Sequence, residues 1–277
     1  MSASPRPFQL PGRHGSPRGA QTAPRCAPQV APALAALAVQ PRVTAFLGVG
    51  REVGTTMIAA LVADRLAGRV STLALDADLA QARGDEAPAG TLDGLLAGDA
   101  RLALRRLRSA VHRGASGVEL LSLPADFPST PSTPRDALRD LLVLARDRYE
   151  RVIVDLGHGV GDLQARALGA VDQVIVVGAG DEIGMTAVAA EVRLLRARGA
   201  PPDRVAVVAN RVRGHADALR TRARGLAVPL VLTLPEDEHA AVAAWDGRVD
   251  PLDWHRPGTL VSGMQDLADW IAGPGAA

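Results

Sequence analysis

The sequence contains no lysine, one cysteine and few aromatic residues, and these shortages exclude several kinds of chemistry. All 31 basic residues are arginine, so any mechanism that depends on a lysine of this chain is excluded. Cys26 has no second cysteine with which to form an internal disulfide. No apolar run approaches the roughly 18 residues of a membrane-spanning helix. The histidines show no metal-ligand spacing, which leaves metallohydrolase chemistry unsupported.

The charges nearly cancel, with 31 basic against 30 acidic residues and a net charge of +1. There is thus no strong signal for a nucleic-acid partner or an anionic membrane. The 277 residues are 47% hydrophobic, which is enough to bury a full core. The sequence has no contiguous apolar signal segment behind a basic start, so we expect a cytoplasmic protein.

The chain divides into two parts of different composition. Residues 1–41 combine many prolines with scattered glycine, serine and arginine, a composition that does not maintain a helix or strand. We expect a disordered Pro/Arg/Ala-rich tail there, followed by one domain over residues 42–277.

Beyond the tail, short β-branched or leucine-rich runs alternate with helical patterns. This alternation is typical of an α/β fold with a doubly wound, mostly parallel sheet that helices flank. The predicted strands are Val43–Leu47, Val70–Leu75, Val118–Ser122, Arg151–Asp155, Gln173–Val177, Val205–Ala209 and Val228–Leu232. The predicted helices are Thr55–Ala67, Arg101–His112, Pro134–Arg148, Ile183–Arg198, Ala216–Arg224 and Leu260–Ala272.

A glycine-rich loop follows the first predicted strand, over residues 48–56, and leads into a helix. Such a loop can present backbone N–H groups to phosphate. With Asp76 after the second strand it is compatible with a dinucleotide-binding Rossmann turn. It is equally compatible with a degenerate Walker A loop, in which Thr55 occupies the lysine position and Thr56 the Mg²⁺-binding position. A turn that binds nothing is the third interpretation.

Acidic residues end two later strands. Asp76 and Asp78 follow the second strand, and Asp155 ends an apolar strand that runs into Gly157-His158-Gly159. An acid at this place, followed by glycines, is what a Walker B site needs to hold Mg²⁺ through water. This arrangement favours the Walker A interpretation of the loop.

The order of these motifs resembles the ParA/MinD family of P-loop ATPases, and within it the CpaE/TadZ-like branch. The likeness covers about residues 43–272. Its motifs are the degenerate P-loop, Asp76-Ala77-Asp78, Thr91–Leu96, Leu120–Pro124, the Tyr149–Gly159 Walker B region, Asn210-Arg211 and Pro235-Glu236-Asp237.

The resemblance implies a role for each matching residue, with ATP and Mg²⁺ as cofactors. Gly50, Arg51, Gly54 and Thr55 would line the phosphates, and Thr56 and Asp155 would hold Mg²⁺. Asp76 would support the ion indirectly, Asp78 would activate water, and Gly159 would let the switch loop approach the γ-phosphate. Asn210 would read adenine, with Arg211 and Asp237 beside the base. The alternative is that the acids only cap strand ends and helices and that Asn210 only satisfies a turn.

The loop departs from the family at its charged positions. The loop of the family is Lys-Gly-Gly-x-Gly-Lys-Thr-Thr. Both of its lysines are missing here, which removes electrostatic stabilisation of the phosphates. Glu52 replaces a glycine beside the phosphate and adds like-charge repulsion. Arg51 offers a substitute cation. We expect a chain that binds nucleotide weakly and hydrolyses it slowly or not at all.

The resemblance implies a spatial-organisation protein for a pilus, secretion or division apparatus, with protein partners there and a nucleotide-dependent homodimer. The alternatives are an active Mg²⁺-ATPase that uses Arg51, and a Rossmann-type oxidoreductase. Against the latter, the chain has no Tyr-x-x-x-Lys pair. The segment Leu260–Ile271 carries acids and no arginine on its polar side, so we expect no autonomous membrane anchor.

Overall fold

The computed structural model describes residues 41–77, 100–114, 116–123, 136–159, 161–200, 202–213, 217–226, 228–245, 256 and 258–273. Its strands are β1 (Val43–Gly48), β2 (Thr72–Asp76), β3 (His112–Arg113), β4 (Glu119–Ser122), β5 (Arg151–His158), β6 (Gln173–Ala179), β7 (Val205–Val212) and β8 (Leu230–Pro235). Its α-helices are α1 (Thr55–Ala67), α3 (Ala100–Ala110), α4 (Ala137–Arg148), α5 (Asp162–Ala167), α6 (Glu182–Ala197), α7 (Asp217–Gly225), α8 (Glu238–Trp245) and α9 (Leu260–Ala272). Residues 1–40 of the predicted tail, Asp78 and the motif Thr91–Leu96 lie outside the described residues.

The described strands form one 8-stranded sheet in the order β3-β4-β2-β5-β1-β6-β7-β8. All neighbours are parallel except β3, which pairs antiparallel with β4 at the edge. Strand β5 lies between β1 and β2. A dinucleotide-binding Rossmann sheet places its second strand directly beside its first. The oxidoreductase alternative is therefore wrong, because its ribose-binding acid would stand one strand too far away.

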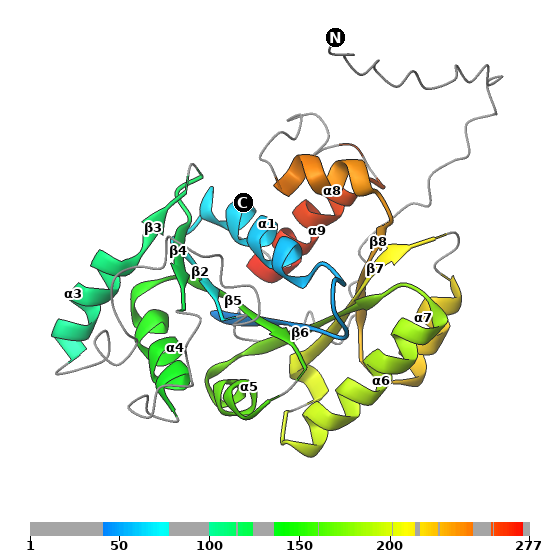
Figure 1. Cartoon of the computed structure of the whole chain (residues 1–277), viewed down its shortest axis with the longest axis horizontal. Helices are drawn as coiled ribbons and strands as arrows, with labels where there is room; N and C mark the ends of the chain where they lie inside the picture. Colours follow the sequence, from blue (N-terminus) through cyan, green and yellow to red (C-terminus); the bar gives the residue numbers. More distant parts are fainter. Residues whose placement is uncertain are drawn as a thin grey trace, which may run out of the picture.

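Helices cover both faces of the sheet, as Figure 1 shows: α1, α8 and α9 lie on one side, and α4, α5, α6 and α7 on the other. The strands alternate between the two layers of core. Val43, Ala45 and Leu47 of β1 pack with the α4–α6 side, whereas Phe46 packs with the α1–α9 side. Burial on both faces explains why the strand sequences are nearly continuous apolar runs. The predicted doubly wound α/β fold is confirmed.

The last helix closes the core on the α1 side. The Thr259 side chain accepts a hydrogen bond from the Ser262 N–H, and the Ser262 hydroxyl accepts one from the Thr259 N–H, which together form a capping box at the start of α9. Leu260, Met264 and Ile271 are among the residues that α9 buries. No helix of the described residues is long and apolar enough to cross a membrane.

The predicted helices and strands are all present with small shifts at their ends, and the structure adds β3, α5 and α8. Strand β8 was predicted over Val228–Leu232 but runs from Leu230 to Pro235. The Pro-Glu-Asp turn therefore starts inside the strand, and Glu236 and Asp237 follow at its carboxyl end.

Candidate functional site

The loop between β1 and α1 passes through the left-handed region at three residues. Gly50, Glu52 and Gly54 have φ values of 93°, 60° and 86°. Glycine adopts such values at no steric cost, whereas a residue with a Cβ pays about 1–2 kcal/mol. Glu52 is thus strained in a place that suits glycine. Its side chain is exposed.

The hydroxyl of Thr55 is turned back onto the start of the loop. A Cβ added to Gly48 would lie 2.4 Å from Thr55 Oγ1 and 3.2 Å from the Gly157 carbonyl oxygen. Thr55 itself is only 7% exposed. Gly48 therefore has to be glycine for packing reasons, and Thr55, which was predicted to occupy the lysine position of a Walker A loop, supplies packing there and no positive charge.

Asn210, at the carboxyl end of β7, contacts the loop between β1 and α1 (residues 48–56), which we call the phosphate loop. Its Nδ2 donates a hydrogen bond of 2.8 Å to the carbonyl oxygen of Val53, and the residue is 3% exposed. The backbone carbonyl oxygen of Asn210 accepts a hydrogen bond of 2.6 Å from the Gly180 N–H. A Cβ on Gly54 would lie 2.7 Å from the same Nδ2. The side chain predicted to contact adenine thus makes its direct contact with the loop backbone.

Two of the predicted acids lie side by side. Asp76 of β2 is the register partner of Asp155 of β5. Both residues lie on the α1 face of the sheet, because their neighbours Ala74 and Ile153, two positions earlier on the same strands, belong to the core on that face. Asp155 is 4% exposed, and its Oδ1 accepts a hydrogen bond of 3.0 Å from the Gly157 N–H.

The loop after β5 contacts the phosphate loop directly. The Gly159 N–H donates to the Gly48 carbonyl oxygen at 3.2 Å. Gly159 has a φ of 75°, and a Cβ on it would meet no atom within 4 Å. The open space beside Gly159 and the half-buried Thr56 at the start of α1 lie at this same edge of the sheet. Carboxylate and hydroxyl oxygens are the ligands that Mg²⁺ prefers, so Thr56 and Asp155 fit such an ion.

The phosphate loop carries two opposite charges that do not neutralise each other. Arg51 and Glu52 are both exposed, and no ion pair joins either of them to another residue of the described chain. The guanidinium of Arg51 is therefore available to an anion, while the carboxylate of Glu52 repels one.

Of the residues predicted around the base, Arg211 is exposed and Asp237 has a structural partner of its own. Arg211 is exposed, with a left-handed φ of 57°. Asp237 caps α8, since its Oδ1 accepts from the Ala240 N–H at 2.9 Å. Glu236 forms an exposed ion pair with Arg213, and the hydrogen bond from Arg213 holds the pKa of Glu236 below its usual value.

No family model matches the chain, and no curated protein matches its sequence. Solved structures do match. The structure is similar to that of a ParA family ATPase from Chlorobium tepidum TLS, with a TM-score of 0.66 and 20% identity over 82% of this chain and 98% of that one. The chain has the ParA/MinD fold.

Two MinD structures give the same result. The septum site-determining protein MinD complexed with Mg-ADP from Pyrococcus horikoshii OT3 matches with a TM-score of 0.63 and 16% identity, over 83% of this chain and 95% of that one. MinD in the MinC:MinD cell division protein complex from Aquifex aeolicus matches with a TM-score of 0.65 and 16% identity, over 84% and 96%. At this identity the likeness establishes the fold of the chain.

The ParA/MinD fold brings most of the predicted site residues to one edge. The loop residues, Asp76, Asp155, Gly159 and Asn210 meet there, while Asp78 lies outside the described residues. The sequence reasoning missed the hydrogen bond from Asn210 to Val53 and the packing of Thr55 on Gly48. Neither contact has a sequence signal, because each depends on how distant segments meet.

Proposed function

We propose that this chain is a spatial-organisation protein of the CpaE/TadZ type that serves a pilus, secretion or division apparatus, with weak nucleotide binding and little hydrolysis. In this proposal the fold acts mainly as a scaffold for protein partners. The nucleotide site is a residual feature of that scaffold.

The observation that carries the proposal is the charge of the phosphate loop. The loop holds a carboxylate at Glu52 in a left-handed position, and a buried threonine, Thr55, at the start of α1. Electrostatic stabilisation by a cation is the largest contribution that a protein makes to phosphoryl transfer. A loop with a threonine in place of that cation, and with a carboxylate beside the phosphate position, binds phosphates weakly.

The other half of the site supports the ParA/MinD interpretation over an unrelated scaffold. Thr56, Asp76 and Asp155 retain the oxygen ligands that would hold and support Mg²⁺ when a nucleotide is bound. The ion would supply charge neutralisation for the β- and γ-phosphates. The residues present therefore fit Mg²⁺ better than they fit the triphosphate.

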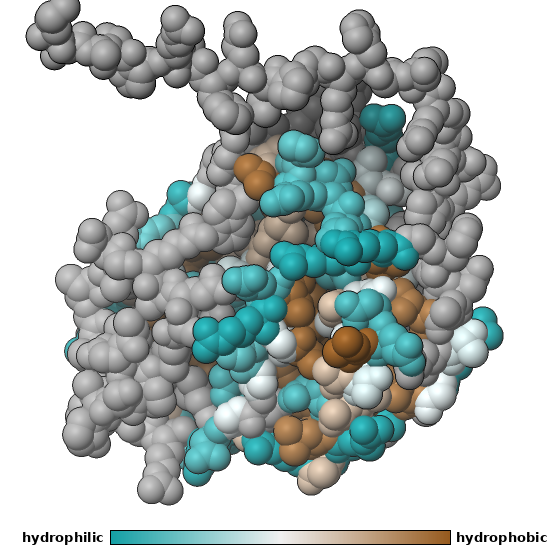
Figure 2. All heavy atoms as spheres, turned by 45° about the vertical axis from the view of Figure 1, so that its right-hand side comes forward, coloured by the Kyte–Doolittle hydropathy of each residue, from teal (hydrophilic) through white to brown (hydrophobic). Residues whose placement is uncertain are grey.

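The proposed partners are proteins of the apparatus and a second copy of the chain. Among the similar structures, one is a MinC:MinD complex and one is a septum site-determining protein. Figure 2, with the α6 and α7 side turned forward, shows hydrophobic side chains interspersed with hydrophilic ones over the coloured part of that face.

One observation favours a second candidate, an active Mg²⁺-ATPase. Arg51 is exposed and has no ion-pair partner among the described residues, so its guanidinium is able to turn toward a phosphate. Arginine forms bidentate contacts with phosphate oxygens and in this way replaces a lysine charge.

A hydrolysis assay separates the two candidates. We expect the unmodified chain to release phosphate from Mg²⁺-ATP no faster than the Asp155→Ala variant, and the Glu52→Gly/Thr55→Lys double variant to exceed both. Turnover that is lost in both Asp155→Ala and Arg51→Gln would instead establish the active enzyme. For the positioning role, we expect a fluorescent fusion to collect at discrete sites in the cell, and a uniform distribution would contradict it.

A further inference from the structure

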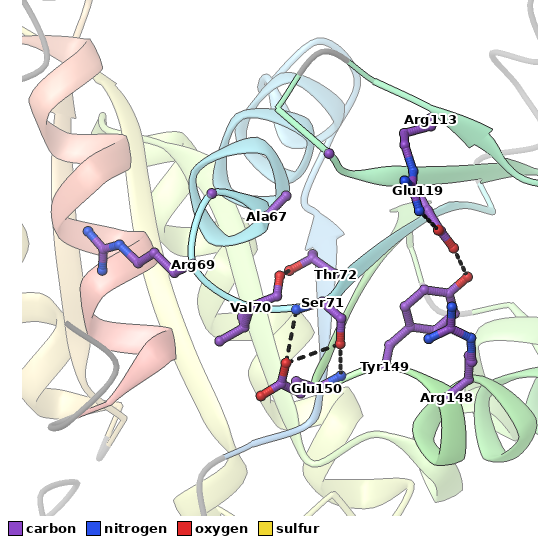
Figure 3. A pocket seen from close by; sticks show the side chains of 12 residues that line it. Ala67, Arg69, Val70, Ser71, Thr72, Arg113, Glu119, Arg148, Tyr149 and Glu150 are labelled. Atoms are coloured by element: carbon purple, nitrogen blue, oxygen red, sulfur yellow. Dashed lines mark hydrogen bonds and ion pairs between the residues drawn. The ribbon is translucent and has the colours of Figure 1, made fainter.

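A cavity of about 360 Å³ opens at the end of the sheet opposite to the phosphate loop. It lies between the end of α1 at Ala67, the start of β2 at Thr72 and the start of β4 at Glu119, beside Tyr149 and Glu150 (Figure 3). Since β2, β4 and β5 all begin here, the cavity lies at the amino ends of the strands. Its volume is within the range of small-molecule sites.

One wall of the cavity is a chain of linked polar groups. Arg113 Nη2 donates to Glu119 Oε1 at 2.7 Å, and the Tyr149 hydroxyl donates to the other oxygen of the same carboxylate. Both oxygens of Glu119 therefore have a donor. Burial and the hydrogen bond to Glu119 raise the pKa of Tyr149, so its hydroxyl stays protonated. Glu119 is thus held as a structural anion of the protein.

On this wall Arg148 is left without a carboxylate. Its guanidinium carbon lies 5.1 Å from the centre of the Tyr149 ring, within the distance of a cation–π contact. Arg148 forms no ion pair with any residue in the described ranges, and its Nε is buried without an acceptor there. An unpaired guanidinium beside a cavity is suited to bind an oxyanion.

The charges around this wall are unbalanced. The charges of Arg113 and Arg148 act on Glu119, and the charges of Arg148 and Arg108 act on Tyr149. Of the arginines that line the cavity, Arg69 is paired with Asp269 and Arg113 with Glu119, so the charge of Arg148 is the one without an ion-pair partner in the described ranges. On the opposite wall Glu150 is exposed and accepts hydrogen bonds from the N–H and the hydroxyl of Ser71.

We propose that this cavity binds the phosphate group of a small ligand, with Arg148 as the main anchor and Arg113 as the second cation. The charge of Arg148 attracts a phosphate group, whose oxygens suit the planar fork of arginine. The site is independent of the phosphate loop, since none of the residues that line it belongs to residues 48–56.

Calorimetric titration of the full chain tests the proposal, with inorganic phosphate, ribose 5-phosphate and adenosine monophosphate as probes. We expect at least one probe to bind saturably at low salt, with a dissociation constant below about 10 mM. Arg148→Gln should weaken it at least about tenfold and Arg113→Gln by about threefold. If inorganic phosphate binds as tightly as the two esters, the site is assigned to the free anion. If an ester binds more tightly than inorganic phosphate, the site is assigned to an esterified ligand.

Two control variants keep the test specific. Arg193→Gln removes the same charge from an exposed position on α6 and should leave binding within about twofold. Loss of binding in Arg51→Gln would assign the measured binding to the phosphate loop and would overturn the proposal as well. Unchanged binding in Arg148→Gln, equal loss in Arg193→Gln, or no saturable binding of any probe would overturn the proposal. Circular dichroism of each variant verifies that the fold is retained.

Discussion

Substitution of Gly54 by alanine tests the contact between Asn210 and the phosphate loop. The new Cβ would lie 2.7 Å from Asn210 Nδ2, at a residue whose φ is 86°. The amide has to move, and its buried hydrogen bond to Val53 O is lost. Gly50→Ala is a matched control, because its φ is 93° but its Cβ would meet only a Val53 methyl group at 3.8 Å.

The difference between the two variants gives the size of the contact. Both pay about 1–2 kcal/mol for a Cβ in the left-handed region, partly offset by lower entropy of the unfolded chain. Only Gly54→Ala also leaves a buried carbonyl without its donor, which costs a further 1–3 kcal/mol or so. We therefore expect Gly54→Ala to reduce the free energy of unfolding by about 1–3 kcal/mol more than Gly50→Ala does.

Equilibrium unfolding in urea measures this difference. In an Asn210→Ala background the clash and the hydrogen bond are both absent, so the two glycine substitutions should become equivalent. Equal unfolding midpoints of the two variants in the otherwise unmodified chain would refute the contact and the role of Asn210 as a support of the loop.

Three further predictions follow from charges in the structure. Glu52→Gly and Glu52→Gln should each tighten Mg²⁺-nucleotide binding by about fivefold or more in an equilibrium titration, because both remove the carboxylate; no change in either would show that Glu52 faces away from the phosphate. Burial raises the pKa of Asp172, but hydrogen bonds from Arg146 and from the N–H groups of Val43 and Arg42 outweigh it and lower that pKa. Asp172→Asn should therefore reduce the free energy of unfolding at pH 7, and this loss should shrink as the pH falls below about 4 toward the lowered pKa. A loss of stability that does not change with pH would contradict this. Because α9 buries its apolar residues and carries acids, the chain should not co-sediment with anionic vesicles, and sedimentation with them would contradict the core role of α9.

The fold was predictable because its strands are buried on both faces and read as apolar runs. Helices α5 and α8 escaped prediction because 6 and 8 residues are too few for a clear helical period. The position of β5 between β1 and β2 was equally hidden, since strand order depends on the path of the crossovers and leaves no mark on the strand itself.

The site was predictable only to the level of an edge. Asp76 and Asp155 were expected near each other because the family resemblance assigns both to the same Mg²⁺, but their direct pairing depends on the strand order. The Asn210–Val53 contact spans 157 residues and has no local signal. The left-handed φ of Glu52 was also hidden, because glutamate carries no preference for that conformation.

The central claim is that the fold retains its acidic edge while the phosphate loop binds nucleotide weakly. Equilibrium binding of labelled ATP, with and without Mg²⁺, to the unmodified chain and to Asp155→Ala tests it most directly. We predict an affinity weaker than about 100 μM, little changed in the variant. Submicromolar binding that requires Mg²⁺ and disappears in Asp155→Ala would contradict the claim and establish a working nucleotide site.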